Sequence, residues 1–230
     1  MSRRSAGVAH IVKADPAFRR IVETSEAMDV RPDARSPFES LLTAIVFQQL
    51  AGAAARAIHG RLIAVLGGEP VAPEAVLSAK PEAMRAAGLS ANKLAAIIDL
   101  AAKFVDGTVP TDDLERLDDD EIVARLVTVR GVGRWTAEMF LLFQLQRPDV
   151  WPTEDLGVRN GWARIHGMAA PPSPKALALL GEVLRPYRST AAWYCWRAVA
   201  STPVVTVPKK PAKPAVKAAG RRPPSRPKKG

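Results

Sequence analysis

The sequence predicts an all-α fold, and three observations support this prediction. Helix start signals recur along the chain, apolar residues follow one another at three- and four-residue spacing, and no segment alternates strictly between apolar and polar residues with turn signals on both sides. The only strand-like stretch, residues 204–207, is enclosed by Pro203 and Pro208. We therefore expect helices throughout the folded part of the chain.

The clearest helix start is at Ser36, which is followed by Pro37 and by Glu39. A serine N-cap, a proline at the first helical position and an acid at the third together form a helix-start signature. The apolar, alanine-rich run over residues 41–66 comes directly after this signature. It is therefore predicted to be helical.

Five further runs are predicted to be helical: residues 93–105, 118–129, 135–145, 174–184 and 191–200. Ser90 and Ser173 stand where N-caps are expected, and Gly107 follows the end of the first of these runs. In the second run, Ile122 and Leu126 are four residues apart and so lie on one helix face.

Positive charge is concentrated in the C-terminal segment. The 230-residue chain has 33 basic and 23 acidic residues, a net charge of +10. Residues 203–230 hold nine of the basic residues and none of the acidic ones, which leaves 24 basic and 23 acidic residues at positions 1–202. The same segment has seven prolines, and it cannot bury enough apolar surface to offset its ordering entropy. We predict a nearly neutral folded body and a disordered basic tail.

Composition excludes several kinds of site. Cys195 is the only cysteine, which excludes an intramolecular disulfide framework and a cysteine-rich zinc or iron–sulfur site. The three histidines lie far apart in sequence, which argues against a histidine-based metal site. No apolar run approaches the roughly 20 residues that span a bilayer, and residues 1–14 lack the apolar stretch of a secretory signal. We expect a cytoplasmic protein, nucleoid-associated if bacterial, that requires no cofactor and binds no membrane.

A Gly-Val-Gly turn between two predicted helices is a candidate binding feature. Gly131 and Gly133 both allow positive φ and a close approach by another backbone. The helix that begins directly after them presents unpaired N–H groups and the positive end of its dipole, which suits a phosphate. An ordinary tight corner, in which glycine ends the first helix, also fits the turn. A nucleotide P-loop does not fit, because no Gly-Lys-Ser/Thr follows.

The residues around this turn and after it form a longer, more specific motif. Residues 129–137 read VRGVGRWTA, and residues 149–161 read DVWPTEDLGVRNG. This combination resembles the helix-hairpin-helix DNA glycosylases, most closely the DNA-3-methyladenine glycosylase II type, which place an aspartate in a Pro-x-x-Asp-Leu-Gly-Val pattern after the hairpin. Three more stretches are similar to segments of that family: IVFQQLAGAAA at 45–55, GLSANK at 88–93 and RSTAAWYCW at 188–196. The resemblance covers about residues 10–200.

The resemblance implies two helical subdomains with the DNA site in the cleft between them. Residues 36–146 are expected to form the central subdomain, with the helix-hairpin-helix at 122–145. Residues 1–35 are expected to pack with residues 147–202 in the second. The chain has no room for the N-terminal β domain of longer family members, and it lacks the four-cysteine cluster of the endonuclease III branch.

Asp155 is the catalytic residue that the resemblance implies. Cleavage of an N-glycosidic bond builds positive charge on the sugar, and a carboxylate in a dry cleft stabilises that charge and orients or deprotonates the attacking water. On sequence alone, an aspartate at a helix start is usually an N-cap. The adjacent Glu154 points elsewhere on a helix and is interpreted as a surface residue.

Trp135 occupies the position at which the bifunctional branch of the family carries a nucleophilic lysine. Tryptophan cannot form a Schiff base, so the resemblance implies a glycosylase without lyase activity. Trp135, Trp196 and Met139 are the expected base pocket, in which an aromatic face attracts a cationic alkylated purine. Core packing is the alternative for all three, and Trp151 and Trp193 are interpreted as core residues.

The other site residues are expected to bind DNA. Gln48, Gln49 and Leu50 lie where the family fills the gap left by a flipped base, and two amides inside an apolar helix are costly to bury without partners. A hydrogen-bonding pair at a helix end is the alternative. The further expected DNA contacts are Gly131, Val132, Gly133, Arg134, Thr136, Ser90 and Lys93. The resemblance also implies a structural monovalent cation on the backbone carbonyls of Val127, Val129 and Val132.

The sequence thus predicts a monofunctional DNA glycosylase of base excision repair that acts as a monomer on double-stranded DNA. It would flip out an alkylated purine such as 3-methyladenine and hydrolyse its N-glycosidic bond. The alternatives are a glycosylase for deaminated or mismatched bases, a non-catalytic helix-hairpin-helix DNA-binding module, and a helical protein–protein scaffold. The binding module leaves Asp155, Trp135 and Trp196 without a role, and the scaffold does not explain the glycine turn.

Overall fold

The computed structural model describes residues 3–28, 33–110 and 114–200, and within these ranges every regular element is a helix. The α-helices are α1 (Arg3–Ala14), α2 (Arg19–Thr24), α3 (Pro37–Phe47), α4 (Gly52–Val65), α5 (Pro73–Ser78), α6 (Pro81–Ala86), α7 (Ala91–Val105), α8 (Asp119–Leu126), α9 (Arg134–Met139), α10 (Leu156–Ile165), α11 (Pro174–Leu180) and α12 (Arg188–Ala200). Short turns of tighter or wider helix are η1 (Pro16–Phe18), η2 (Leu114–Arg116), η3 (Phe140–Gln144) and η4 (Glu182–Leu184). The all-α prediction is confirmed. The predicted tail, with the strand-like stretch inside it, lies outside the described residues.

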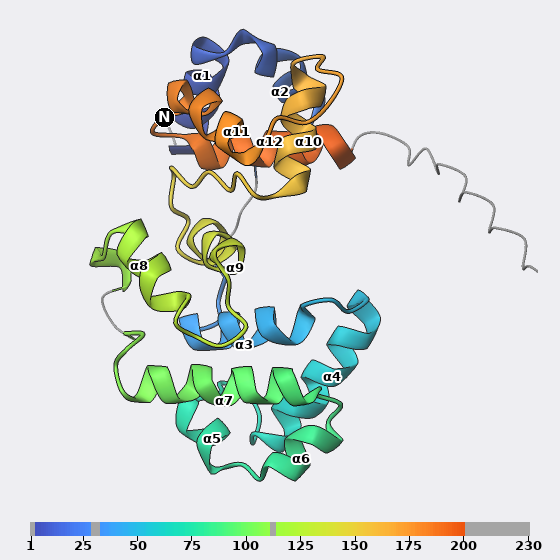
Figure 1. Ribbon diagram of the computed structural model, residues 1–230, viewed down its shortest axis with the longest axis vertical. Coiled ribbons are helices and arrows are strands. Elements are labelled where there is room, and N and C mark those ends of the chain that lie inside the picture. The colour runs from blue at the N-terminus through green and yellow to red at the C-terminus, as the bar shows by residue number, and fades with distance from the viewer. Residues whose placement is uncertain (1–2, 29–32, 111–113, 201–230) are drawn as a thin grey trace, which may run out of the picture.

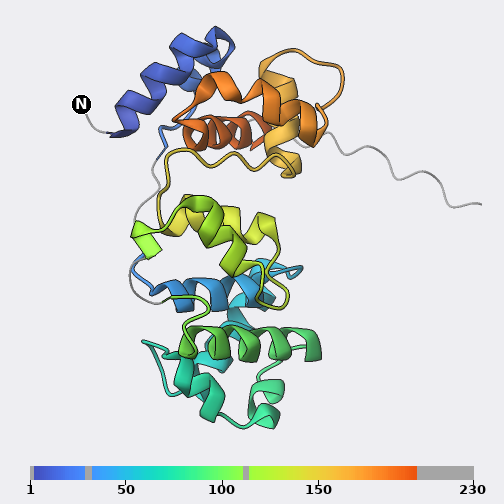
Figure 2. The same ribbon diagram turned by 60° about the vertical axis from the view of Figure 1, so that its left-hand side comes forward.

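The helices are stacked in groups along the long axis of the molecule (Figures 1 and 2). Helices α1, α2, α10, α11 and α12 gather at one end, α8 and α9 lie in the middle, and α3 to α7 form the other end. Helix α12 packs against α10, α1 and α2, so segments from both ends of the described chain share one core. This packing is what the expected pairing of residues 1–35 with 147–202 requires, while the subdomain boundaries themselves stay a prediction.

The local start signals place the helices as predicted. Ser36 Oγ accepts the Glu39 N–H at 3.2 Å, and the Glu39 carboxylate accepts the Ser36 N–H at 2.9 Å, which completes a capping box at the start of α3. Ser90 and Ser173 accept N–H bonds in the same way at the starts of α7 and α11. These helices therefore begin where the sequence alone says they should.

Three predicted helices differ from the observed ones. The run over 174–184 is divided, because α11 ends at Leu180 and the tighter turn η4 covers Glu182–Leu184. The run over 41–66 is broken, because α3 ends at Phe47, Gln49 adopts a φ of +54°, and α4 begins at Gly52. The run over 135–145 changes its hydrogen-bonding pattern after Met139, where η3 continues it as a π-helical turn. Helices of six residues, such as α5 and α6, are too short for apolar periodicity to reveal.

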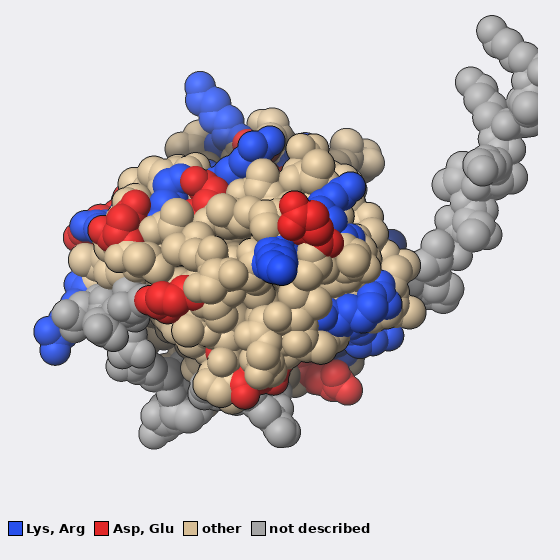
Figure 3. Space-filling model, turned by 90° about the horizontal axis from the view of Figure 1, so that it is seen from below, with Lys and Arg blue, Asp and Glu red and all other residues tan. Residues whose placement is uncertain are grey.

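Basic and acidic side chains are interspersed on the face shown in Figure 3. This mixture fits the near balance of charges over residues 1–202. Within the described ranges, no helix is both long enough and apolar enough to cross a membrane.

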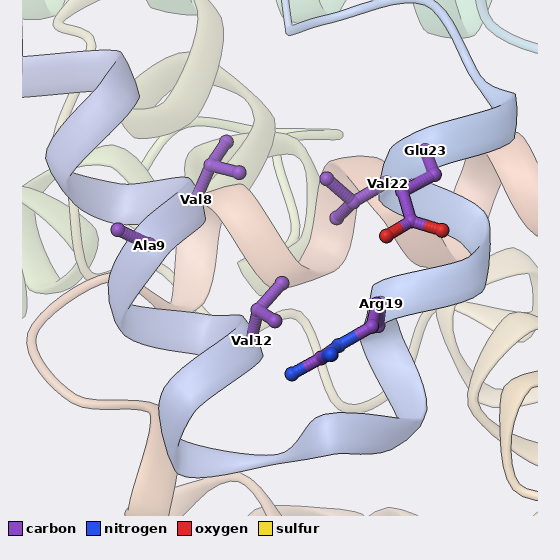
Figure 4. Close-up of a pocket in the computed structure, with 6 residues that line it drawn as sticks. All are labelled: Val8, Ala9, Val12, Arg19, Val22 and Glu23. Carbon is purple, nitrogen blue, oxygen red and sulfur yellow. The ribbon is translucent and has the colours of Figure 1, made fainter.

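A pocket of about 340 Å³ lies between α1 and α2 (Figure 4). Val8, Val12 and Val22 face one another across it, and Arg19 and Glu23 lie on the α2 side. None of its lining residues belongs to the site predicted from sequence.

Candidate active site and DNA interface

Asp155 is the N-cap of α10. Its Oδ1 accepts the backbone N–H of Val158 at 2.8 Å, and its own backbone is extended, as a capping residue requires. The N-cap interpretation of Asp155 is therefore confirmed. It is compatible with catalysis, because a capping carboxylate keeps further acceptor positions.

Two tryptophans donate to the same carboxylate. Trp196 Nε1 lies 2.9 Å from Asp155 Oδ1, and Trp135 Nε1 lies 2.7 Å from Asp155 Oδ2. Trp135 comes from α9 and Trp196 from α12, so three helices meet at Asp155. Each carboxylate oxygen thus has its own indole donor, which fixes the orientation of the group.

The faces of the two indoles differ in their surroundings. Trp196 is stacked on Phe143, with ring centroids 5.8 Å apart and an interplanar angle of 23°. The Trp135 residue is 48% exposed. Stacking on a flipped base stays a prediction for both, and Trp135 has the more accessible surface. Sequence reasoning missed Phe143, which lies four residues after Met139 in the same predicted run.

Gly157 allows Trp196 to approach the carboxylate. A Cβ at this position would lie 2.8 Å from Trp196 Cδ1 and 3.0 Å from Asp155 Oδ1. The second residue of α10 must therefore be small for the indole to reach Asp155. This is the physical reason for the glycine in the Asp-Leu-Gly-Val stretch, which the sequence alone did not reveal.

Glu138 is a buried acid beside this site that sequence reasoning missed. Arg134 Nε donates to Glu138 Oε1 at 3.0 Å, and Arg134 itself is largely exposed. Burial raises the pKa of Glu138, and the nearby negative charges of Glu154 and Asp155 raise it further, while Arg134 opposes both effects. Its signal in the sequence is its position one turn after Arg134 on α9.

The other residues predicted in or near the pocket range from buried to exposed. Met139 is half-buried at the end of α9, and Glu154 is exposed, as the surface interpretation requires. Trp151 is buried and donates to the Leu177 carbonyl at 2.9 Å, and Trp193 is half-buried against the core. The core interpretation of Trp151 and Trp193 is confirmed.

The hairpin between α8 and α9 is held by Asp99 of α7. Asp99 Oδ2 accepts the Arg130 N–H at 2.7 Å and also pairs with Lys103 Nζ at 2.7 Å. These bonds and the charge of Lys103 lower the pKa of Asp99 although burial opposes them. The carboxylate therefore anchors the start of the turn to α7.

The two hairpin glycines are not equivalent. Gly131 has a φ of +76°, which favours glycine, whereas Gly133 has a φ of −92° and a ψ of 172°. A Cβ on Gly133 would meet nothing within 4 Å. Gly133 therefore does not use the positive φ that a glycine allows, and it is instead the N-cap of α9. Of the neighbouring residues expected to contact DNA, Arg134 is exposed, while Val132 and Thr136 are buried.

Residues 48–51, here called the wedge segment, form the break between α3 and α4. Gln48 is the C-cap of α3, and its Nε2 donates to the Gly131 carbonyl at 3.0 Å. Gln49 and Leu50 are exposed. The two amides are thus at a helix end and not inside a helix, and Gln48 is tied to the hairpin turn.

Ser90 and Lys93 lie at the start of α7. Ser90 Oγ accepts the Lys93 N–H at 3.2 Å. The Lys93 ammonium donates to the Val46 and Gln48 carbonyls, at 2.6 and 2.7 Å. The lysine is therefore engaged with the end of α3, and DNA contact by Ser90 and Lys93 stays a prediction.

The carbonyls expected to bind a monovalent cation lie in the turn after α8. Val127 is the C-cap of α8, and the Val129 carbonyl accepts the Val132 N–H at 3.0 Å, which leaves it one lone pair. Neutral carbonyl oxygens at the negative end of a helix suit such an ion. This argument applies to Val127 and Val129, and binding of the ion stays a prediction.

Comparison with known proteins adds independent evidence. Residues 42–186 match the family described as HhH-GPD superfamily base excision DNA repair protein. The chain is 35% identical over 194 residues to DNA-3-methyladenine glycosylase 1 of Schizosaccharomyces pombe, covering 82% of this chain and 84% of that protein.

Two solved structures are also similar. The Schizosaccharomyces pombe 3-methyladenine DNA glycosylase Mag1 in complex with abasic DNA has a TM-score of 0.72 and 34% identity, over 84% of this chain and 95% of that one. A DNA-3-methyladenine glycosidase from Bacillus halodurans has a TM-score of 0.79 and 32% identity, over 85% of this chain and 89% of that one. The family match and these similarities agree with the hairpin and with the aspartate that two tryptophans bind. The chain belongs to the HhH-GPD superfamily of base excision DNA repair proteins.

Proposed function

We propose that the protein is a monofunctional DNA glycosylase that excises alkylated purines such as 3-methyladenine from double-stranded DNA. The observation that carries the proposal is the Asp155 carboxylate, which is held by an indole donor on each oxygen beside the helix-hairpin-helix. The names of the similar proteins support the alkylated-base substrate. The protein would act as a monomer in the compartment that holds the DNA.

The chemistry follows from the acceptor positions on Asp155. A carboxylate has about four lone-pair sites; Oδ1 uses two, for Val158 N and Trp196 Nε1, and Oδ2 uses one, for Trp135 Nε1. One acceptor position therefore remains on Oδ2. It can orient the attacking water, while the negative charge stabilises the positive sugar as the base departs.

The base is held by aromatic surface, and no covalent bond forms between the protein and the sugar. Trp135 presents an indole, which has no amine to attack the sugar, so the bond is broken by water and the abasic strand stays intact. Alkylated purines such as 3-methyladenine are cationic, and cation–π attraction to an indole face contributes roughly 0.5–2 kcal/mol. Such a base also leaves the stack more easily than an undamaged one.

The test is the identity of the released bases. Wild-type protein is incubated with methylated DNA and with duplexes that contain uracil or hypoxanthine. Release of 3-methyladenine from the methylated DNA is expected, with the strand uncut until alkali is added. Release of only uracil or hypoxanthine supports the alternative of a glycosylase for deaminated bases, and a covalent adduct trapped by borohydride contradicts the monofunctional assignment.

The matched variant is Asp155→Asn. Asparagine caps a helix about as well as aspartate, and its Oδ1 can still accept from Val158 and Trp196, so the fold and the binding of an abasic duplex should be kept although the bond from Trp135 is lost. Base release should fall on the order of 10²–10³-fold or more, because the charge that stabilises the transition state is lost. Activity within about threefold of wild type removes Asp155 from the mechanism. Binding without base release by the wild type favours the non-catalytic DNA-binding module.

A further inference from the structure

The Lys93 side chain reaches from α7 to the end of α3. Its Nζ lies 2.6 Å from the Val46 carbonyl oxygen and 2.7 Å from that of Gln48. A helix leaves its last carbonyls without partners inside the helix, and a cation at this end also complements the helix dipole. Lys93 therefore closes the C-terminal end of α3 at the point where the wedge segment begins.

The wedge segment is held from a second side by the hairpin. Gln48 Nε2 donates to the Gly131 carbonyl at 3.0 Å, and Gly131 is the hairpin residue with a left-handed backbone. The Gln48 carbonyl is thus bound by α7 and the Gln48 amide by the hairpin turn. These two contacts fix the residue that precedes the exposed part of the segment.

The exposed part follows directly from this fixed point. Gln49 has a φ of +54°, an uncommon conformation for a residue other than glycine. Leu50, the next residue, is 38% exposed although it is large and apolar. A strained backbone and an exposed leucine persist where neighbouring contacts hold them, and Lys93 supplies two of those contacts.

We propose that Lys93 is a positioning residue, which holds the wedge segment in the conformation that enters the DNA, in place of the direct DNA contact expected for it from the sequence. The inference rests on the proposed function, because a wedge is needed only where a base is flipped. The lysine ammonium already has two carbonyl acceptors. Burial lowers the pKa of Lys93, which agrees with an ammonium directed into the protein.

The first test is the salt dependence of binding to a duplex with a tetrahydrofuran abasic analogue. Each phosphate that a cation neutralises contributes about 0.9 to the slope of log K against log salt. Lys93→Met should leave this slope unchanged, whereas Arg134→Met, which removes an exposed hairpin cation, should reduce it. A reduction by about one unit in Lys93→Met overturns the proposal.

The second test reads the wedge itself. A 2-aminopurine placed beside the abasic analogue reports insertion by its fluorescence, and the analogue is not cleaved. Lys93→Met should lower the insertion equilibrium roughly tenfold, because the hydrogen bonds it removes are charged. Lys93→Arg keeps a charged donor and should retain most of the insertion. Equal insertion by wild type and Lys93→Met overturns the proposal. Should Lys93→Met not fold, Lys93→Gln takes its place, because it also removes the charged donor, and equal insertion by wild type and Lys93→Gln overturns the proposal.

A double-mutant cycle identifies the route by which Lys93 acts. Single-turnover base release is measured for wild type, for Lys93→Met, for Gln49→Ala/Leu50→Ala, which removes the exposed side chains of the wedge segment, and for the protein with all three substitutions. Since Lys93 acts through the wedge, its loss should have little further effect once the wedge is gone, whereas effects that simply multiply contradict this route. Absence of base release by the wild type counts against the proposed function, and the fluorescence test still decides the role of Lys93.

Discussion

Trp135 and Asp155 are 20 residues apart in sequence and lie at the starts of different helices, yet Trp135 Nε1 donates to Asp155 Oδ2 at 2.7 Å. The indole has two chemically separate features at this place. Its N–H donates to the carboxylate, and the residue is 48% exposed, so its ring is the proposed surface on which a base stacks. Substitutions at Trp135 can separate the two.

Trp135→Phe should lower the rate of base release about tenfold with little change in binding of an abasic duplex. Phenylalanine keeps an aromatic face but loses the N–H, and a hydrogen bond to a charged group is worth about 1.5–3 kcal/mol. Trp135→Ala should lose more, since it removes the stacking surface as well. The rates are measured under single-turnover conditions.

Trp193→Phe is the matched control. The Trp193 indole N–H is buried on α12 and has no hydrogen-bond partner among the described residues, so its removal breaks no such bond there. Equal rate losses in Trp135→Phe and Trp193→Phe contradict a specific role for the bond to Asp155.

Gly133→Asp should weaken DNA binding without destabilising the fold. Gly133 is the N-cap of α9 with an ordinary backbone and open space at its Cβ, and aspartate is a better N-cap than glycine. The new carboxylate would stand where the hairpin is expected to meet phosphate. The affinity for all duplexes should fall with no change in the preferred base, because phosphate contacts do not read sequence.

Gly133→Asn separates charge from shape. Asparagine caps equally well and is neutral, so it should bind DNA more tightly than Gly133→Asp, with the difference shrinking at high salt. A changed base preference at unchanged affinity contradicts the assignment of this turn to the phosphate backbone. Thermal unfolding of both proteins shows that the fold is kept.

Glu138→Gln should change the pH dependence of stability. The raised pKa of Glu138 means that the folded protein holds this proton more tightly than the unfolded chain. The stabilising contribution of Glu138 is therefore present below its ordinary pKa near 4.5, and it is lost as the pH rises from there through the folded pKa. Glu138→Gln does not titrate, so its free energy of unfolding should decline less over this window.

The measurement is urea unfolding at a series of pH values from the acid side of this window to neutral pH. The ion pair with Arg134 contributes little to the comparison because Arg134 is 64% exposed in its side chain. Glu154→Gln, at an exposed neighbour, is the control for a simple loss of negative charge. Superimposable pH profiles of Glu138→Gln and wild type contradict the interpretation of Glu138 as a group whose ionisation opposes folding.

Deletion of residues 203–230 should weaken DNA capture and flatten its salt dependence while the cleavage step is kept. This segment holds nine of the ten net positive charges. If only part of these nine charges engages phosphate, the slope of log K against log salt should change by roughly 2–5 units. Binding is measured at several salt concentrations for the two proteins, and parallel lines mean that the tail takes no part in binding.

The sequence determined the features that depend on neighbouring residues. Ser36, Ser90 and Ser173 begin helices because each side chain accepts an N–H three residues along, a contact that needs only local geometry. The hairpin and the aspartate that follows it could also be identified from the sequence, since both lie within short, distinctive stretches. The sequence alone was therefore sufficient to name Asp155 as a candidate.

Only the tertiary structure decided which groups meet. The bond from Gln48 to Gly131 joins residues 83 apart, and Lys93 reaches carbonyls 45 and 47 residues away. Such contacts depend on how whole helices pack, and the same residue types in a different packing would face solvent. The break at Gln49 and the ordinary backbone of Gly133 were hidden for the same reason, because packing selects among backbone conformations that local sequence leaves open.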